Sequence, residues 1–232
     1  MTSIAVIPAR GGSKRIPRKN IKLFHGAPII TYAIKTALES NIFDEVIVST
    51  DDEEIAELSL NFGAKIPWMR PKVLADDYAT TINVMQDAAK KLKTSHSDLK
   101  SICCLYPTTP LLKPEFLLKS QEILIKNDWN YVFSGLKVNA SPYRFFSLEE
   151  TEKVKMLFPQ NETSRTQDLS PIYYDAGQFY WGTVPAWELG LPIFSSKSTI
   201  VELPAESVID IDTEDDWLKA ERLFQLQKGS RV

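Results

Sequence analysis

The sequence predicts an α/β protein with a Rossmann-like, mostly parallel or mixed sheet flanked by helices. Short apolar segments of strand length alternate along the chain with longer segments whose apolar residues recur at helical spacing. The opening apolar segment, 4–8, leads directly into a basic loop that contains two glycines. The 232 residues are enough to bury one continuous core, so we expect a single domain over 1–232.

The alternation is clearest in the first part of the chain. Pro28 suits the first turn of a helix that runs to Ser40, and Asp51 or Asp52 can cap a helix that ends near Asn61. Pro114 opens a helix that runs to about Lys126. In chain order, the predicted elements are strand 4–8, helix 28–40, strand 45–50, the helix ending at 61, strand 65–68, helix 80–93, strand 101–106, helix 114–126 and strand 131–138.

The alternation breaks between Asn139 and Asp175. This stretch is rich in Ser, Pro and aromatic residues and has weak periodicity, so we interpret it as an insertion that projects from the sheet as strands or loops. Beyond it we expect a strand at 177–182, short strands or extended segments at 200–203 and 207–211, and a helix from Thr213 to about Gln227, with Thr213 and Asp216 in a capping arrangement.

Composition argues against several classes of function. The net charge of −3 does not suit a nucleic-acid partner. No segment approaches the ~18 unbroken apolar residues that span a bilayer, and the first apolar run is too short for a signal peptide. We therefore expect a cytoplasmic protein without a membrane partner. Cys103 and Cys104 lie in an apolar segment, which predicts buried strand thiols rather than a disulfide or a metal site.

The loop after the opening segment predicts a phosphate-binding site. It leaves the carboxyl end of a strand, where open α/β sheets bind ligands. Gly11 and Gly12 would let backbone N–H groups approach phosphate oxygens, and Ser13 adds a donor. The spacing is neither that of a Walker loop nor GxGxxG, so a solvated basic turn is the alternative. The basic residues of this stretch, with no acid among them, are Arg10, Lys14, Arg15, Arg18, Lys19 and Lys22.

A pair of aspartates near the end of the chain predicts a metal site. In an extended segment Asp210 and Asp212 lie on one face, and Ile211 faces the core. Two carboxylates can hold Mg²⁺, which prefers oxygen ligands and keeps several waters. The alternative is structural, because Asp212 or Thr213 could simply cap the final helix.

Several segments together resemble the acylneuraminate cytidylyltransferase family, which acts on sugar acids. The resemblance covers nearly the whole chain, and the segments that carry it are 4–20, 43–51, 70–81, 106–111 and 209–213. It implies a fold of the nucleotide-diphospho-sugar transferase type. It also implies transfer of CMP from CTP to the anomeric hydroxyl of an acidic nonulosonic sugar, with release of pyrophosphate and Mg²⁺ as the cofactor. It also implies a homodimer in which the insertion, about 139–175, lies at the interface and lends residues to the neighbouring site.

The same resemblance implies a role for individual residues. It makes Arg10, Lys19 and Asp212 catalytic, with Asp212 next to the attacking hydroxyl. It implies Asp210 and Asp212 as metal ligands. The nucleotide-binding residues would be Ala9, Arg10, Gly11, Gly12, Ser13, Lys14, Lys19, Asn20, Arg70, Ala79 and Thr81. The sugar-binding residues would be Tyr106, Thr108, Arg144, Arg165 and Gln178, with Arg144 and Arg165 as cations for the sugar carboxylate.

Two further segments, 158–168 and 175–182, resemble the branch of the family that acts on pseudaminic acid, whose product serves flagellin glycosylation. Tyr106 stands where the neuraminate enzymes usually place a glutamine, although the following Pro-Thr-Thr is nearer to those enzymes. The aromatic residues of 175–182 could instead be core residues. N-acetylneuraminate, legionaminate or a 3-deoxy-octulosonate therefore stay open as acceptors. A non-catalytic nucleotide-binding regulatory module also stays open, as does uridylyl or adenylyl transfer to a neutral sugar phosphate.

Overall fold

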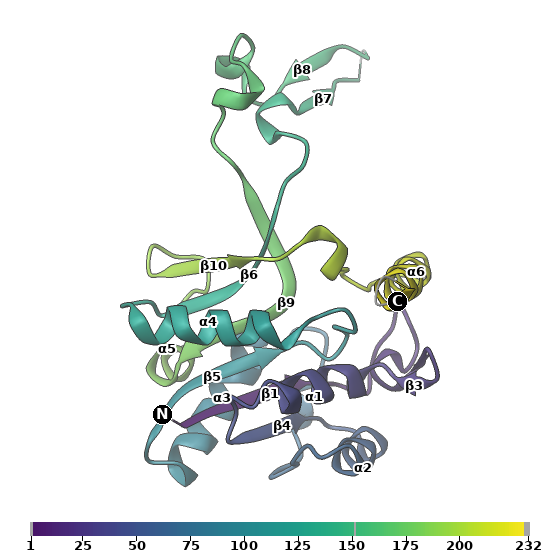
Figure 1. The fold of residues 1–232 in the computed structure, drawn as a ribbon, viewed down its shortest axis with the longest axis vertical. Helices are drawn as coiled ribbons and strands as arrows, with labels where there is room; N and C mark the ends of the chain where they lie inside the picture. Colours follow the sequence, from purple (N-terminus) through teal and green to yellow (C-terminus); the bar gives the residue numbers. More distant parts are fainter. Residues whose placement is uncertain (1, 151, 230–232) are drawn as a thin grey trace.

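A six-stranded mixed sheet forms the centre of the computed structural model, which describes residues 2–150 and 152–229 (Figure 1). Its strands follow the order β10-β6-β9-β5-β1-β4, and β9 runs antiparallel to both of its neighbours while the other five share one direction. The predicted fold class is confirmed. The strands are β1 (Thr2–Pro8), β4 (Glu45–Ser49), β5 (Leu99–Leu105), β6 (Tyr131–Lys137), β9 (Tyr173–Thr183) and β10 (Ser198–Glu202).

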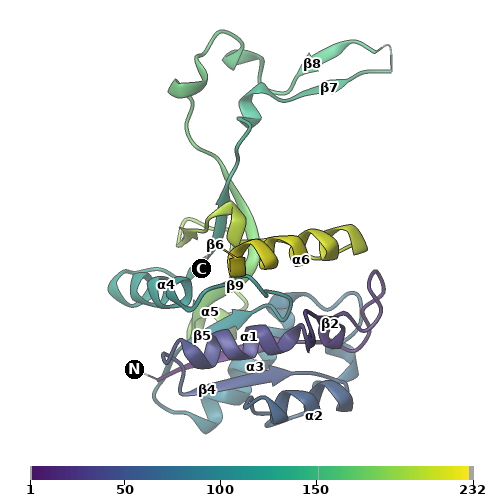
Figure 2. The same cartoon turned by 45° about the vertical axis from the view of Figure 1, so that its right-hand side comes forward.

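Helices cover both faces of the sheet, which is why its strands are apolar at successive positions (Figure 2). Ala5 and Ile7 of β1 pack in a cluster with α1 and α4, and Ile4 and Val6 pack in a second cluster with α3 and α5. A third cluster joins α6 to the hairpin β2–β3. These elements are β2 (Leu23–Phe24), β3 (Ala27–Pro28), α1 (Ile30–Glu39), α2 (Glu53–Asn61), α3 (Thr81–Ser95), α4 (Pro114–Lys126), α5 (Val184–Leu189) and α6 (Glu214–Gly229).

Several helix boundaries follow the predicted signals, but Pro28, expected in the first turn of a helix, lies in β3 instead, and α1 begins only at Ile30. The Asp52 carboxylate accepts a hydrogen bond from the Ile55 N–H at 3.0 Å, and α4 begins at Pro114. At α6, the Thr213 hydroxyl accepts from the Asp216 N–H at 3.2 Å while the Asp216 carboxylate accepts from the Thr213 N–H at 3.0 Å. This reciprocal arrangement satisfies the first helical N–H groups without the Asp212 side chain. Short 3-10 turns occur at η1 (Lys19–Ile21), η2 (Lys72–Leu74), η3 (Pro142–Arg144), η4 (Pro159–Asn161), η5 (Thr166–Asp168) and η6 (Ala205–Ser207).

One expected strand is wrong, and one helix was missed. The segment 65–68 forms only an isolated bridge between Lys65 and Ile47, because Pro67 has no N–H with which to continue a ladder. The segment 207–211, expected as a short strand or an extended segment, is extended at Val208 and pairs with no strand of the described sheet. Helix α5 was not predicted. Thr183 caps it at the end of β9, but its six residues are too few to give a periodic pattern.

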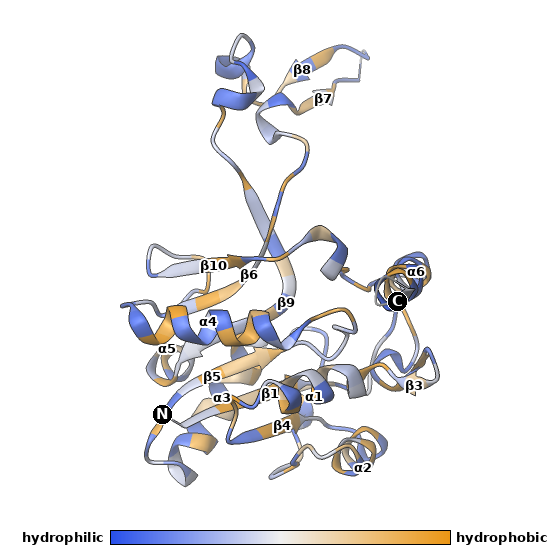
Figure 3. Ribbon diagram, viewed as in Figure 1, coloured by the Kyte–Doolittle hydropathy of each residue, from blue (hydrophilic) through white to orange (hydrophobic). Residues whose placement is uncertain are grey.

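The segment between β6 and β9 forms an arm that extends away from the body (Figure 1). Its tip carries the hairpin of β7 (Phe146–Leu148) and β8 (Val154–Met156), which pairs with no strand of the central sheet. Apolar residues recur along this hairpin, as the orange segments in Figure 3 show, and the Leu148 and Val154 side chains are exposed. Residues 1, 151 and 230–232 of the expected domain lie outside the described residues.

Two further expectations concern buried thiols and membrane spans. Cys103 and Cys104 are free and fully buried on opposite faces of β5, as predicted, and burial raises the pKa of both thiols. Within 2–150 and 152–229, no helix is both long and apolar enough to cross a bilayer.

Candidate functional site

A pocket lies at the carboxyl ends of β1 and β5, between the two loops that follow these strands. The chain passes from β1 to β4 on one side and returns to β5 on the other, so this is the switch point at which open α/β sheets bind ligands. The start of α3 forms a third wall. The lining residues are Pro8, Arg10, Ser13, Lys14, Arg15, Ile16, Lys19, Asn20, Arg70, Ala79, Thr81, Val84, Tyr106, Pro107 and Thr108.

The two glycines of the first loop have different surroundings. The Gly11 N–H donates to the Asp51 carboxylate at 3.1 Å, and a Cβ on Gly11 would lie 2.5 Å from Asp52 Oδ2. A glycine is therefore required at position 11, where the backbone closely approaches Asp52, the residue that caps α2. A Cβ on Gly12 would meet nothing within 4 Å. Neither glycine lines the pocket, and neither does the fully buried Ala9. Their predicted contact with phosphate stays a prediction.

The cations of the basic loop divide into two groups. Arg18 pairs with Asp52 and Glu54, and Lys22 pairs with Glu214, so both stabilise packing outside the pocket. Arg10, Lys14, Arg15 and Lys19 line the pocket. The buried Asn20 holds the loop in place because its side-chain amide donates to the Arg10 carbonyl at 2.9 Å.

One carboxylate, Asp77, faces the cations at the outer side of the pocket. Arg10 NH1 lies 3.0 Å from Asp77 Oδ1 and also donates to the Asp76 carbonyl at 2.7 Å. Lys14 pairs with the same Asp77 side chain. These contacts, Lys14 foremost, lower the pKa of Asp77. A phosphate group would compete with Asp77 for the same two cations.

The acidic pair meets the remaining cations of the loop. Arg15 NH1 lies 2.8 Å from Asp212 Oδ2, and Lys19 Nζ lies 3.5 Å from Asp212 Oδ1 and donates to the Ile211 carbonyl at 2.6 Å. Ile211 is fully buried in the cluster beneath α6, which anchors the segment. The pKa of Asp210 is raised by desolvation and then by the Asp212 carboxylate. The two carboxyl groups are thus close enough to feel each other's charge.

Asp210 and Asp212 by themselves supply only part of the ligands that Mg²⁺ requires. Among residues 2–150 and 152–229 no cluster of three or more Asp, Glu, His or Cys side chains could hold a metal. Mg²⁺ is usually bound by one or two carboxylates, with waters and substrate phosphates completing its shell. Because Asp212 is free of the helix cap and next to Arg15 and Lys19, two cations that line the pocket, Asp210 and Asp212 fit that kind of site.

Arg70 supplies a buried cation in the pocket wall. Only 6% of the residue is exposed, and burial lowers its pKa to about 10. Its guanidinium donates to the Ser49 hydroxyl at 3.2 Å and to the Ser49 and Leu74 carbonyls. The part of the chain that the structure describes places no carboxylate within 4.0 Å of it. A buried guanidinium held by neutral partners leaves positive charge for an electron-rich ligand group.

The predicted sugar-binding residues are scattered. Tyr106 and Thr108 line the pocket, with the Tyr106 hydroxyl 2.8 Å from the Thr81 hydroxyl. Gln178 is 2% exposed, and its side-chain amide donates to the Ala176 carbonyl of the same strand at 2.9 Å. It is not among the residues that line the pocket. Sequence reasoning listed Arg15 among the cations of the basic loop without giving it a role of its own, and it did not name Asp77 or Pro107, although both lie within segments that it singled out.

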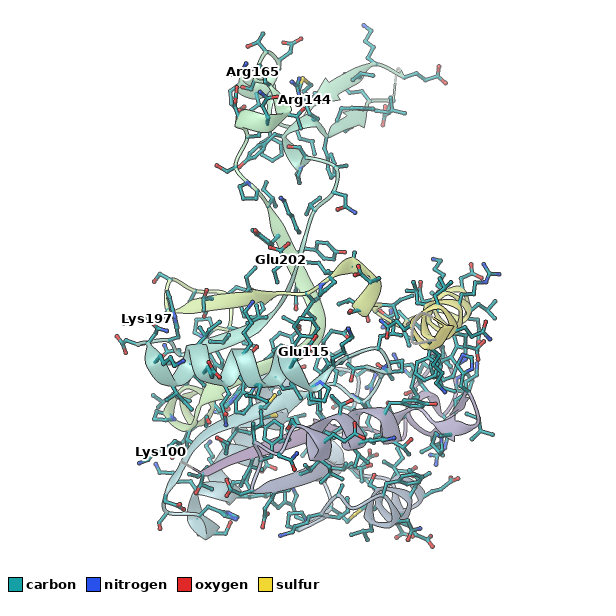
Figure 4. The ribbon with its side chains drawn as sticks, in the orientation of Figure 1. Lys100, Glu115, Arg144, Arg165, Lys197 and Glu202 are labelled. Carbon is teal, nitrogen blue, oxygen red and sulfur yellow. The ribbon has the colours of Figure 1, made fainter. Side chains whose placement is uncertain are left out.

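Arg144 and Arg165 lie at the far end of the arm from the pocket (Figure 4). Arg144 NH1 donates to the Glu162 carbonyl at 2.5 Å, and its second amino group donates to the Ser164 carbonyl. Arg165 Nε lies 2.8 Å from Asp168 Oδ2. Both side chains therefore order the arm tip, and the fold does not bring them to the pocket of their own chain.

Comparisons with known proteins agree with this geometry. The sequence model of a family described as "Cytidylyltransferase" matches residues 4–227. The chain is 44% identical to the pseudaminic acid cytidylyltransferase of Campylobacter jejuni, covering 99% of each chain. It is 34% identical to the CMP-N,N'-diacetyllegionaminic acid synthase of Legionella pneumophila, covering 100% of each. The solved structure of CMP:2-keto-3-deoxy-manno-octonic acid synthetase complexed with CTP matches with a TM-score of 0.71 at 16% identity, covering 98% of this chain and 100% of that one.

Proposed function

The chain belongs to the cytidylyltransferase family and is a CTP-dependent nucleotidyltransferase, and we propose that it transfers CMP from CTP to the anomeric hydroxyl of pseudaminic acid, releasing pyrophosphate. The observation that carries the choice of acceptor is the higher identity, over nearly the full length, to the pseudaminic acid enzyme than to the legionaminic acid synthase. The product would serve as a donor for flagellin glycosylation, made in the cytoplasm.

The pocket suits a nucleoside triphosphate whose phosphates lie against the basic loop. Arg10, Lys14 and Lys19 offer charged donors, and hydrogen bonds to ionised groups contribute ~1.5–3 kcal/mol each. We place the base and ribose against four other residues that line the pocket, namely Asn20, Arg70, Ala79 and Thr81. Ser13 adds a hydroxyl donor to the phosphate side.

The proposed reaction is an in-line displacement at phosphorus. The anomeric hydroxyl oxygen of the sugar acid forms a bond to the α-phosphorus of CTP, and the bond from that phosphorus to the pyrophosphate oxygen breaks. Arg10 and Lys19 stabilise the negative charge that develops on the leaving pyrophosphate. Asp212 accepts the proton of the attacking hydroxyl. Its position beside Lys19 supports this role, because the proton acceptor then lies next to the cations that hold the phosphates.

We further propose that Asp210 and Asp212 hold Mg²⁺ together with phosphate oxygens and water. When bound, the ion would neutralise charge on the phosphate oxygens of CTP. The support is the fit of the two carboxylates to a hard cation and their place opposite the basic loop.

A homodimer would complete the sugar side of the site. An isolated two-stranded hairpin is marginally stable in water, yet β7–β8 exposes Phe146, Leu148 and Val154. A second copy that covers this apolar surface would also carry Arg144 and Arg165 toward a neighbouring pocket, where they could pair with the sugar carboxylate.

A panel of acceptors tests the proposed substrate. Pyrophosphate release would be measured with CTP and Mg²⁺ against pseudaminic acid, legionaminic acid, N-acetylneuraminic acid and 3-deoxy-manno-octulosonic acid. We expect the highest kcat/KM with pseudaminic acid. A higher value with another acid would assign the chain to that acid, and no turnover with any acid despite CTP binding would contradict catalysis altogether.

A further inference from the structure

A second cavity, called the α1–α6 cavity below, lies between α1, α6 and the loop that leads into α4, and Figure 2 shows α6 alongside α1. Its volume is about 580 Å³, which is within the size range of pockets that bind small molecules. The loop 106–113 separates it from the nucleotide pocket, the pocket lined by the basic loop. Tyr106, Pro107 and Thr108 line the nucleotide pocket, whereas Pro110, Leu111 and Leu112 line the α1–α6 cavity. The two share no lining residue among those that the structure describes, so the proposed reaction gives the second cavity no role.

Aromatic and aliphatic side chains form much of the α1–α6 cavity. Tyr32 of α1 and Phe224 of α6 meet edge to face, with ring centroids 5.3 Å apart. Leu38 and Phe62 also line the cavity, although 42% of the first and 46% of the second are exposed. Apolar surface of this kind is unfavourable in water, so a ligand with an apolar body would be stabilised by covering it.

Lysine side chains give the cavity an excess of positive charge. Lys35, Lys113 and Lys228 line it, and Glu39 is the one acid among its described lining residues, which leaves a net charge of +2. Glu39 lies 3.7 Å from Lys35, so these two charges offset each other. Lys113 has a longer contact, 4.0 Å from Glu115. Lys228 Nζ lies 4.7 Å from the centre of the Phe224 ring, next to the apolar wall. An anionic group would therefore find Lys113 and Lys228 close to the surface that takes an apolar body.

Hydrogen bonds hold the walls of the cavity, so a ligand would not have to order them. The Thr36 hydroxyl donates to the Leu112 carbonyl at 3.3 Å, which joins α1 to the loop 106–113. Within that loop, the Leu112 N–H donates to the Thr109 carbonyl at 3.3 Å. The Tyr32 hydroxyl donates to the Phe24 carbonyl at 2.8 Å. A pocket arranged in advance costs a ligand less free energy to bind.

We propose that the α1–α6 cavity binds a small aromatic anion, with its ring against Tyr32 and Phe224 and its anionic group beside Lys113 and Lys228. The aromatic lining favours a ring, because aromatic pairs attract each other beyond the burial of their surface. An uncharged ring would gain only the burial, and a small hydrophilic anion only the charge contacts, whereas an aromatic anion gains both. The inference does not depend on the proposed function, since no residue given a part in the reaction lines this cavity.

Fluorescence titration of the full chain with anilinonaphthalenesulfonate, an aromatic sulfonate, tests the proposal. We expect Lys113→Glu combined with Lys228→Glu to weaken binding of this probe roughly fivefold or more, because two attractive charges become repulsive. The matched control combines Lys90→Glu with Lys119→Glu, which changes the net charge equally at exposed lysines outside the cavity. The uncharged analogue N-phenyl-naphthylamine should bind both double variants alike. Phe62→Ser should weaken both probes, since it removes part of the apolar wall, and circular dichroism checks the fold of each variant.

The same affinity for the sulfonate probe in the two double variants would overturn the proposal, because any loss would then reflect only the net charge of the chain. Displacement of the probe by CTP would place it in the nucleotide pocket and would also overturn the proposal. A probe affinity that falls as dimers form at higher protein concentration would assign the cavity to a second copy of the chain instead. Failure of the unmodified chain to release pyrophosphate, with the probe bound as expected, would contradict the proposed function alone.

Discussion

Arg15 NH1 lies 2.8 Å from Asp212 Oδ2, which joins the loop after the first strand to the segment before the last helix. Lys19 reaches the same carboxylate across 193 residues of sequence. The contact places the proposed proton acceptor and metal ligand beside the cations expected to hold a triphosphate. The chemistry at this junction is therefore open to direct tests by substitution.

Replacing Asp212 with Asn should abolish most pyrophosphate release while the protein stays folded. The amide keeps the shape but loses the charge and the proton acceptor, which contributes roughly 10²-fold or more to such reactions. The measurement is kcat at saturating CTP and Mg²⁺, with circular dichroism as a check of the fold. Asp215→Asn, in the exposed first turn of α6, is the control. Near-normal turnover of Asp212→Asn would rule out its assigned role.

Replacing Asp77 with Asn should tighten CTP binding. Asp77 pairs with Arg10 and Lys14, so its removal frees two cations for phosphate. Because the pairs are exposed, we expect only about a two- to fivefold lower Kd, shrinking as salt screens the charges. Calorimetry at two ionic strengths measures this. Asp128→Asn, whose carboxylate pairs with Lys197 away from the pocket, should bind CTP normally. Weaker binding in Asp77→Asn would mean that Asp77 helps to hold the nucleotide.

The two glycines of the loop should differ in their tolerance of alanine. The Cβ of Gly11→Ala would lie 2.5 Å from a carboxylate oxygen that Arg18 holds in place, whereas that of Gly12→Ala has open space. We expect Gly11→Ala to lower the free energy of unfolding by about 1–3 kcal/mol, as overpacking does, and Gly12→Ala to change it little. Urea unfolding compares them. Equal stability of the two variants would contradict the close packing of Gly11.

The pair between Arg18 and Asp52 should give the stability a dependence on acid pH. The hydrogen bond from Arg18 is the main cause that lowers the pKa of Asp52 in the folded state. The pair therefore stabilises the protein in full above the unfolded pKa of ~3.9, and this stabilisation is lost as the pH falls through the folded pKa. Asn can also cap a helix, so Asp52→Asn removes the charge pair alone. We expect a loss of up to about 1 kcal/mol at pH 7 that begins to shrink at about pH 4, the unfolded pKa, and disappears once the pH is below the lowered folded pKa. A loss that is constant across this range would assign the effect to the cap instead.

Mixing two inactive variants should restore activity if the arm serves a neighbouring pocket. Arg144→Ala and Asp212→Asn each damage every site of a homodimer. A mixed dimer, however, has one site that combines an intact Asp212 with an intact Arg144 from the other chain. After unfolding and refolding together, about a quarter of the normal pyrophosphate release should return, since half of random dimers are mixed. No recovery, with mixed dimers present by native mass spectrometry, would place Arg144 outside the neighbouring site.

Local signals in the sequence were sufficient for most elements. Side chains that cap helices, such as Asp52 and Thr213, act within a few residues, and so their effect can be predicted without knowing the fold. The buried Cys103 and Cys104 follow from the apolar pattern of a strand covered on both faces. The short helix α5 was missed because six residues are too few for a periodic pattern.

The candidate site was predicted in part. Arg10, Lys14, Lys19, Arg70 and Thr81 line one pocket because the carboxyl ends of neighbouring strands meet at the switch point of the sheet. The partners of these residues could not be predicted in the same way. The ion pairs of Asp77 with Arg10 and Lys14 depend on how distant segments pack. The same is true of the burial of the Gln178 side chain.

The sequence by itself determined most of the segments that become strands and helices and which loop carries the cations, since those properties depend on neighbours along the chain. Only the tertiary structure decided that Asp212 meets Arg15 and that Asp77 pairs with Arg10 and Lys14. It also decided that Arg144 lies on an arm away from its own pocket. Such contacts depend on strand order and on packing between segments far apart in sequence, which no local pattern records.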